Sequence, residues 1–195
     1  MARTGRVSKE QSDLNRESII STSSEMFREK GLDGVSLKDI MSAAGLTHGG
    51  FYGHFASKDA LEMAACERAF EEASVQAKTH ESANFAQLVE HYLSPVHRDS
   101  PANGCPVAAL ATDIQRKGPE KPVHQAYVSG VRDMAEQIKK LQDSATADDI
   151  EDKHLMQFAL MTGALMLARA TRGDDISERF LKAAKAALLD KDKIR

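Results

Sequence analysis

The segment from Ser36 to Leu61 most constrains the fold, because two short helix signals separated by one glycine precede a longer helix. Ser36, with Asp39 three residues later, matches a capping box, which marks the start of a helix. Gly45 ends that short helix and permits the left-handed backbone that a tight turn needs. The order of elements predicts a helix-turn-helix unit at about 36–55.

Helical spacing of apolar residues continues along the rest of the chain, and no strand-like alternation interrupts it. We therefore expect an all-α fold of nine helices, in which three short helices precede a long one. The first begins near Leu14, and proline and glycine punctuation predicts an irregular connection at 94–104. A helix is expected at 47–55, with Thr47 as its cap, and others at 58–79, 85–96, 155–170 and 176–188. Two more are expected between them, one that begins at Pro106 and one that ends near Gln142.

Composition excludes several classes of protein. Apolar residues make up 42% of the chain and charged residues 28%, as in ordinary helical globular proteins. The net charge of −3 argues against coating nucleic acid without sequence preference, so any DNA contact must be local. The longest apolar stretch, 155–170, contains Gln157 and Arg169 and is too short to cross a bilayer. The N-terminus has no secretory signal, which predicts a cytoplasmic protein with no membrane partner, whose Cys66 and Cys105 are thiols.

The run Phe51-Tyr52-x-His54-Phe55-x-Ser57-Lys58 closes the helix-turn-helix segment. With the preceding residues from Gly31, it resembles the DNA-binding head of the TetR family of bacterial repressors. The resemblance is strong over about 14–65 and implies a nine-helix TetR-like homodimer that binds a palindromic double-stranded DNA operator and releases it when a small-molecule effector binds. It implies a basic N-terminal arm at 1–13, a three-helix DNA-binding domain at 14–57, and an effector-binding and dimerisation domain at 58–195.

Physical roles within the head follow from how a recognition helix meets DNA, with its first residues on base edges and phosphates. Gly49 and Gly50 are poor helix formers, which favours a close approach of the backbone to DNA over a merely weak helix start. Phe51 and Phe55 are expected in the core, whereas Tyr52 either contacts DNA or packs as a core aromatic. The expected DNA-binding residues are Arg3, Arg6, Ser36, Lys38, Thr47, His48, Gly49, Tyr52, His54 and Lys58.

The body is expected to hold an effector pocket and a dimer interface. The stretch 155–170 is apolar nearly all round, so it must be buried on two sides, and the family resemblance places the interface on the last two helices. Arg169 is expected to bind carbonyl or carboxylate groups. No cofactor is expected, and no residue cluster has the spacing of a metal site. The expected pocket residues are Met63, Cys66, Phe70, Leu88, Tyr92, Cys105, Leu110, Ile114, Tyr127 and Met134, and the expected interface residues are Phe158, Gly163, Leu165, Met166, Phe180, Leu181 and Ala184.

Two other functions remain open at this point. Cys105 stands between Gly104 and Pro106 at a predicted helix N-terminus, where the helix dipole lowers a thiol pKa. This position suggests a redox or electrophile switch, whereas the alternative is a small buried residue that closes a turn. An enzyme is the remote alternative, because the chain contains no nucleophile elbow, phosphate loop, zinc-protease motif or dinucleotide fingerprint.

Overall fold

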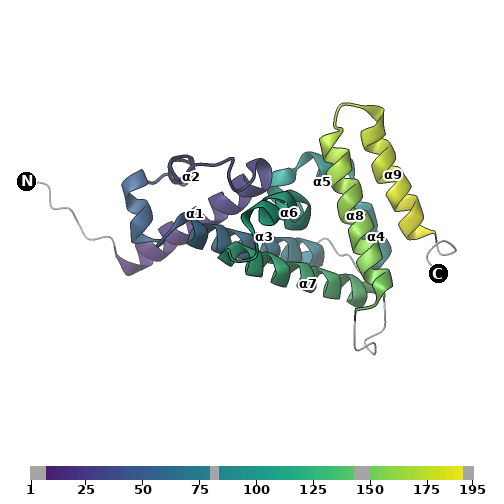
Figure 1. Cartoon of the computed structure of the whole chain (residues 1–195), viewed down its shortest axis with the longest axis horizontal. Helices are drawn as coiled ribbons and strands as arrows, with labels where there is room; N and C mark the ends of the chain where they lie inside the picture. The colour runs from purple at the N-terminus through teal and green to yellow at the C-terminus, as the bar shows by residue number, and fades with distance from the viewer. Residues whose placement is uncertain (1–7, 80–83, 143–149, 191–195) are drawn as a thin grey trace, which may run out of the picture.

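The structure, a computed structural model, describes residues 8–79, 84–142 and 150–190. Within these ranges the protein is all-α, as predicted, and has no strand (Figure 1). The elements in chain order are α1 (Lys9–Lys30), α2 (Leu37–Ala43), the 3₁₀ helix η1 (His48–Gly53), α3 (Lys58–Thr79), α4 (Phe85–Tyr92), α5 (Pro95–Asp99), the 3₁₀ helix η2 (Pro101–Asn103), α6 (Pro106–Lys117), α7 (Pro122–Gln142), α8 (Asp152–Ala170) and α9 (Asp175–Leu189).

The first helix begins earlier than the apolar periodicity indicated. The Ser8 hydroxyl accepts a hydrogen bond from the Gln11 amide and so caps α1, which starts at Lys9 instead of near Leu14. The C-terminal part of the expected basic arm is therefore helical. Arg3 and Arg6 lie outside the described residues.

The expected helix at 85–96 is in fact two helices. Pro95 cannot donate a backbone hydrogen bond and its ring clashes with the preceding turn, so α4 ends at Tyr92. The Ser94 side chain then accepts a hydrogen bond from the His97 amide, and Pro95 begins α5. The stretch 94–104, predicted to be irregular, thus contains α5 and η2.

The molecule is elongated, with α1, α2 and η1 toward one end and α8 with α9 at the other (Figure 1). The long helix α3 packs along both α1 and α7, and α6 contacts α1, α3, α7 and α8. The short η2 also packs on α1. One continuous hydrophobic core runs from Ile19 and Phe27 in α1 to Leu181 and Leu188 in α9. Any displacement of α6 or η2 therefore acts directly on α1.

Candidate functional site

The turn after α2 has the geometry that the sequence predicts. The Ser36 hydroxyl accepts a hydrogen bond from the Asp39 amide at 3.2 Å, and the Asp39 carboxylate accepts one from the Ser36 amide at 3.2 Å. These bonds complete the capping box. The Ser36 hydroxyl also donates to the Asp39 carboxylate at 2.5 Å, and this bond, followed by the one from the Ser36 amide, lowers the pKa of Asp39. Gly45 has φ 72°, in the left-handed region, and the Leu46 amide donates to the Met41 carbonyl at 2.8 Å. The turn is thus fixed by local hydrogen bonds and by one glycine.

The second element of the unit differs from the prediction. The sequence predicted a helix at 47–55, but the chain forms the shorter and tighter 3₁₀ helix η1. Gly49, Gly50 and Gly53 lie within it, and glycine disfavours a regular α-helix. Thr47 occupies the N-cap position, as predicted, but its side chain makes no capping hydrogen bond.

The aromatic residues of η1 divide between core and surface. Phe51 is fully buried and stacks on Phe55, with ring centroids 5.8 Å apart, as expected of core residues. Tyr52 is 70% exposed and touches Phe51 edge-on, which rules out the packed-core interpretation of Tyr52. Of the other predicted DNA-binding residues in the described head, Ser36, Lys38, Thr47, His48 and Gly49 are exposed, and His54 is half-buried.

Lys58, which the sequence predicted to contact DNA, makes contacts within the chain. Its Nζ donates to the Leu32 carbonyl at 2.7 Å and lies 3.7 Å from the buried Glu62 carboxylate. Lys117 of α6 also bonds Glu62, at 3.0 Å, and pairs with Asp33 at 3.1 Å. Burial raises the pKa of Glu62. These contacts join α3 and α6 to the loop that follows α1.

Arg28 is a buried residue that connects three parts of the fold and was not singled out from the sequence. Its guanidinium donates to the Ser24 carbonyl at 3.2 Å, to the Glu72 carboxylate at 2.5 Å and to the Gly104 carbonyl at 3.5 Å. The side chain is 1% exposed.

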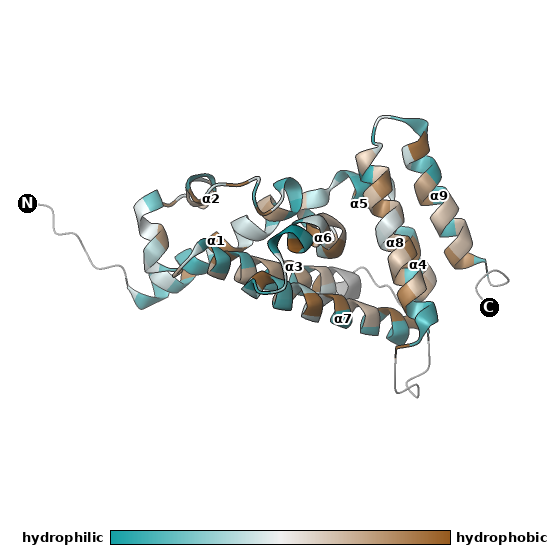
Figure 2. Ribbon diagram, in the orientation of Figure 1, coloured by the Kyte–Doolittle hydropathy of each residue, from teal (hydrophilic) through white to brown (hydrophobic). Residues whose placement is uncertain are grey.

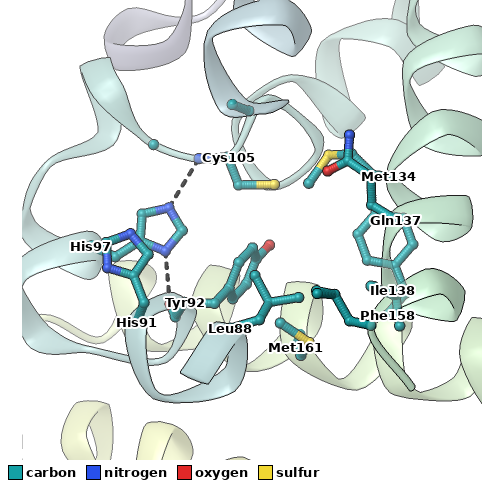
Figure 3. Close-up of a pocket in the computed structure, with 13 residues that line it drawn as sticks. Leu88, His91, Tyr92, His97, Cys105, Met134, Gln137, Ile138, Phe158 and Met161 are labelled. Carbon is teal, nitrogen blue, oxygen red and sulfur yellow. Dashed lines mark hydrogen bonds between the residues drawn. The ribbon is translucent and has the colours of Figure 1, made fainter. Parts of the chain in front are cut away.

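A cavity of about 70 Å³ lies in the body among α3, α4, α7 and α8 (Figure 3). Four predicted pocket residues line it: Leu88, Tyr92, Cys105 and Met134. The other six, Met63, Cys66, Phe70, Leu110, Ile114 and Tyr127, do not. The wall from α8 was not predicted because that helix was assigned to the dimer interface, and the part from α5 was not predicted because an irregular connection was expected there. The remaining lining residues are Ala73, His91, His97, Gly104, Gln137, Ile138, Leu141, Phe158 and Met161.

His97 joins the elements at one end of this cavity. Its Nδ1 lies 2.7 Å from the Tyr92 carbonyl oxygen, and its Nε2 lies 3.0 Å from the Cys105 amide (Figure 3). A carbonyl only accepts and an amide N–H only donates, so Nδ1 carries the proton and Nε2 accepts. Burial lowers the pKa of His97 to about 4, which keeps the ring neutral. Arg169 of α8 donates to the carbonyls of His97 and Arg98, as expected of a carbonyl partner.

The expectation of a lowered Cys105 pKa is wrong. Cys105 is 3% exposed, and burial raises its pKa. The amides of Val107 and Ala108 at the start of α6 act in the opposite direction, as does the Tyr92 hydroxyl, but burial outweighs them. The redox alternative therefore lacks the stabilised thiolate on which it depended.

Both cysteines are expected to react slowly with N-ethylmaleimide at neutral pH. Burial raises the pKa of Cys66 to about 12, and both thiols are buried, so little thiolate is present or accessible. Modification followed by mass spectrometry should be at least about tenfold slower than in the same protein unfolded in guanidinium chloride, where the thiol pKa returns to about 8.5. Fast modification of Cys105 with an apparent pKa below that value would restore the redox interpretation.

The predicted dimer-interface residues lie mainly inside the single chain. Phe158, Leu165, Leu181 and Ala184 are buried in the protomer core, while Gly163, Met166 and Phe180 are half-buried. The exposed apolar residues of α8 are instead Leu155, Met156, Leu160 and Leu167. The predicted residues on α8 thus lie mainly on the side that the protomer itself covers, and the exposed apolar residues lie on another side of the same helix.

No helix among the described residues is long and apolar enough to cross a membrane. In the same residues, no group of histidine, cysteine, aspartate and glutamate side chains has the arrangement of a metal site.

The head has the helix-turn-helix arrangement, and known proteins match the chain in this region. The sequence profile described as "Bacterial regulatory proteins, tetR family" matches residues 19–65. The HTH-type transcriptional regulator YerO of Bacillus subtilis, described as uncharacterized, is 44% identical over 52 residues, which cover 27% of this chain and 18% of YerO. The match thus spans less than a fifth of that relative.

Solved structures match the whole fold. A TetR-family regulator from Cytophaga hutchinsonii aligns with a TM-score of 0.69 at 24% identity, over 94% of this chain and 96% of that one. A TetR regulator from Chloroflexus aurantiacus aligns with a TM-score of 0.72 at 23% identity, over 92% and 94% of the two chains. Residues 19–65 therefore match the TetR-family profile, and the chain shares the fold of these TetR-family structures.

Proposed function

We propose that the protein is a repressor that binds a palindromic operator as a homodimer and releases it when a small molecule occupies the body cavity. The observation that carries this proposal is that Tyr52 is exposed while the aromatic residues on either side of it are held in the core. Its neighbours Phe51 and Phe55 are buried and stacked, so Tyr52 is presented outward from a fixed backbone. A large aromatic side chain left 70% exposed on a helix-turn-helix element suits contact with DNA.

The other proposed DNA contacts surround Tyr52. Thr47 and His48 are exposed at the start of η1, and a Cβ added at Gly49 would meet nothing within 4 Å. Since the protein itself leaves this space open, Gly49 supports a close approach of the DNA backbone. Ser36 and Lys38 are exposed at the start of α2, which would cross the phosphate backbone. Arg3 and Arg6 remain proposed minor-groove contacts, and His54 a proposed phosphate or base contact.

The proposed division of the chain is a head at 14–57 and a body at 58–195. One recognition element reads too few bases for useful specificity, so two heads in a symmetric dimer are expected to read two half-sites. The exposed apolar residues of α8 support a dimer through α8 and α9. The cavity supports effector binding in the body.

Selection of DNA fragments from a genomic library by the purified protein, followed by sequencing, tests the proposal. The selected sites should share a palindrome and bind the dimer below micromolar concentration at moderate salt. A site without symmetry, or no site at that concentration, would contradict the proposed mode of DNA binding.

Replacing Tyr52 with Ala should weaken operator binding by about tenfold or more, since one lost DNA contact costs about 1–3 kcal/mol. Stability should change little, because the side chain is exposed. Gel-shift titration gives the affinity, and denaturant unfolding gives the stability. Tyr52→Phe separates loss of the hydroxyl from loss of the ring, and Val96→Ala, at a 73% exposed site in the body, is the control. Unchanged affinity in Tyr52→Ala would remove Tyr52 from the interface.

A further inference from the structure

The walls of the body cavity contain little charge. Among the described residues that line it there is no aspartate, glutamate, lysine or arginine. Leu88, Ile138, Phe158 and Met161 make up much of the apolar wall. Moving an ion from water into such a space is costly unless an opposite charge meets it. The lining therefore disfavours both anionic and cationic ligands.

The nearest positive charge lies behind this wall and is not among the residues that line it. The Arg169 guanidinium lies behind Gly104, where it donates to the backbone carbonyls of His97 and Arg98, and its charge also acts on Tyr92 and Cys105. A neighbouring groove between α3 and α7 shares Met134 and Gln137 with the cavity. That groove is lined by four carboxylates and one lysine, and this negative charge disfavours the approach of anions. The residues are Glu67, Glu71, Asp133, Glu136 and Lys140.

His97 does not offer a ligand a hydrogen bond through its ring nitrogens. Nδ1 donates to the Tyr92 carbonyl and Nε2 accepts from the Cys105 amide, so both are occupied by the backbone. Because the ring is neutral, it also supplies no charge. The ring is part of the wall, and it ties α4 and α5 to the start of α6.

Tyr92 and Gln137 are the polar groups best suited to receive a ligand. The Tyr92 hydroxyl points into the cavity, as does the Cys105 sulfur (Figure 3). The hydroxyl also hydrogen-bonds with the Cys105 thiol and lies 3.4 Å from the Thr162 hydroxyl, and a ligand oxygen can replace these weak or long contacts. The Gln137 amide nitrogen donates to Ser74 at 2.9 Å, which leaves its carbonyl oxygen as the acceptor toward a ligand.

From this lining we infer that the effector is a small, uncharged, mainly apolar molecule with one hydroxyl or carbonyl oxygen, which hydrogen-bonds to Tyr92. This inference rests on the proposed function, because it names the ligand class of the same cavity. Burial of the apolar part against Phe158 and Met161 supplies the affinity, and the Tyr92 hydroxyl selects the oxygen-bearing ligand.

The small size of the cavity implies that ligand binding moves the residues around it. At about 70 Å³ it is roughly half of the 150 Å³ that accommodates benzene in an engineered protein cavity. Any ligand of that size must therefore displace a wall. Met134 and Met161 can repack. On the opposite side, Cys105 begins α6 and the preceding Gly104 accepts a hydrogen bond from Arg28 of α1. A displacement of this wall would therefore be passed through Arg28 to α1, which is part of the DNA-binding head.

Four probes that share one ring test the inference: toluene, benzyl alcohol, benzoate and benzylammonium. Binding to the full-length protein is measured by ligand-observed NMR titration. Benzyl alcohol should bind the most tightly, and the two ions at least about tenfold more weakly, because their charge must be desolvated. Tyr92→Phe should reduce the affinity for benzyl alcohol by about three- to tenfold and leave toluene unchanged.

Tyr127→Phe is the matched control for loss of a body tyrosine hydroxyl. The Tyr127 hydroxyl donates to the Val107 carbonyl at 3.1 Å, and Tyr127 does not line the cavity, so probe preference should not change. Tighter binding of either ion, no binding of the uncharged probes, or equal affinity of benzyl alcohol for wild type and Tyr92→Phe would overturn the inference.

Operator release, measured separately by gel shift, distinguishes this inference from the proposed function. If the protein prefers the uncharged probes as predicted but a bound probe does not release DNA, the inferred ligand class is supported. The proposed release of DNA by a ligand in the cavity is then contradicted. If a charged compound occupies the cavity and releases DNA, the ligand class is wrong and the proposed function stands.

Discussion

Replacing Leu160 with Glu is expected to make the protein monomeric and to lower its operator affinity by about 10²- to 10⁴-fold, the gain that a linked second binding module provides. Met156, Leu160 and Leu167 are 61%, 39% and 48% exposed, and their spacing places them along one side of α8. A Cβ added at Gly163 on the same side would meet nothing within 4 Å. Figure 2 shows that α8 is hydrophobic along most of its length. A carboxylate at position 160 would be buried without a partner in the proposed dimer.

Sedimentation velocity measures the oligomeric state, and gel-shift titration measures the operator affinity. Val96→Glu is the matched control, since it places the same charge at a more exposed apolar site on α5. That variant should remain dimeric and bind DNA as wild type does. A dimeric Leu160→Glu variant would show that this side of α8 is not the interface, whereas a monomeric variant with full affinity would show that DNA binding does not require the dimer.

The helical class and the start of the head could be predicted because their signals are local. The Ser36 and Asp39 capping box and the left-handed Gly45 each depend on residues within one turn of chain. Periodicity could also show that α8 is apolar all round. It could not show which side the protomer covers, because Phe158 and Met156 are equally apolar but one is buried in the core and the other is exposed.

The cavity could be predicted only in part, because its walls come from helices distant in sequence. Tyr92 and Cys105 were recognised as candidates, but His97 was missed, since its position follows from the break at Pro95 and from backbone contacts of two other elements. The Cys105 pKa was expected to fall because a helix N-terminus is visible in sequence, whereas the burial that raises it is not. Local motifs show what a residue can do, and the tertiary environment decides which effect is larger.

Arg28→Met is expected to lower the free energy of unfolding by about 3 kcal/mol, the lower end of the range for breaking a buried ion pair. The variant keeps an apolar stem in the space of the arginine side chain, so the loss isolates the guanidinium. It removes the donor to the carbonyls of Ser24 and Gly104 and leaves the Glu72 carboxylate without its buried partner. Because Glu72 is 28% exposed, water can partly replace the lost contact, which favours the lower value.

Arg68→Met provides the control, because Arg68 joins the same two helices at the surface. Its guanidinium pairs with Glu17 of α1 and with Glu71, all of them more exposed than Arg28. Exposed ion pairs contribute about 0–1 kcal/mol, so this variant should lose much less stability. Guanidinium chloride unfolding at one fixed protomer concentration keeps the dimer contribution constant between variants. Equal losses in the two variants would show that burial of Arg28 does not strengthen its contacts. A larger loss in Arg28→Met would support Arg28 as the polar connection between the wall of the cavity at Gly104 and the helix α1 that carries the DNA-binding head.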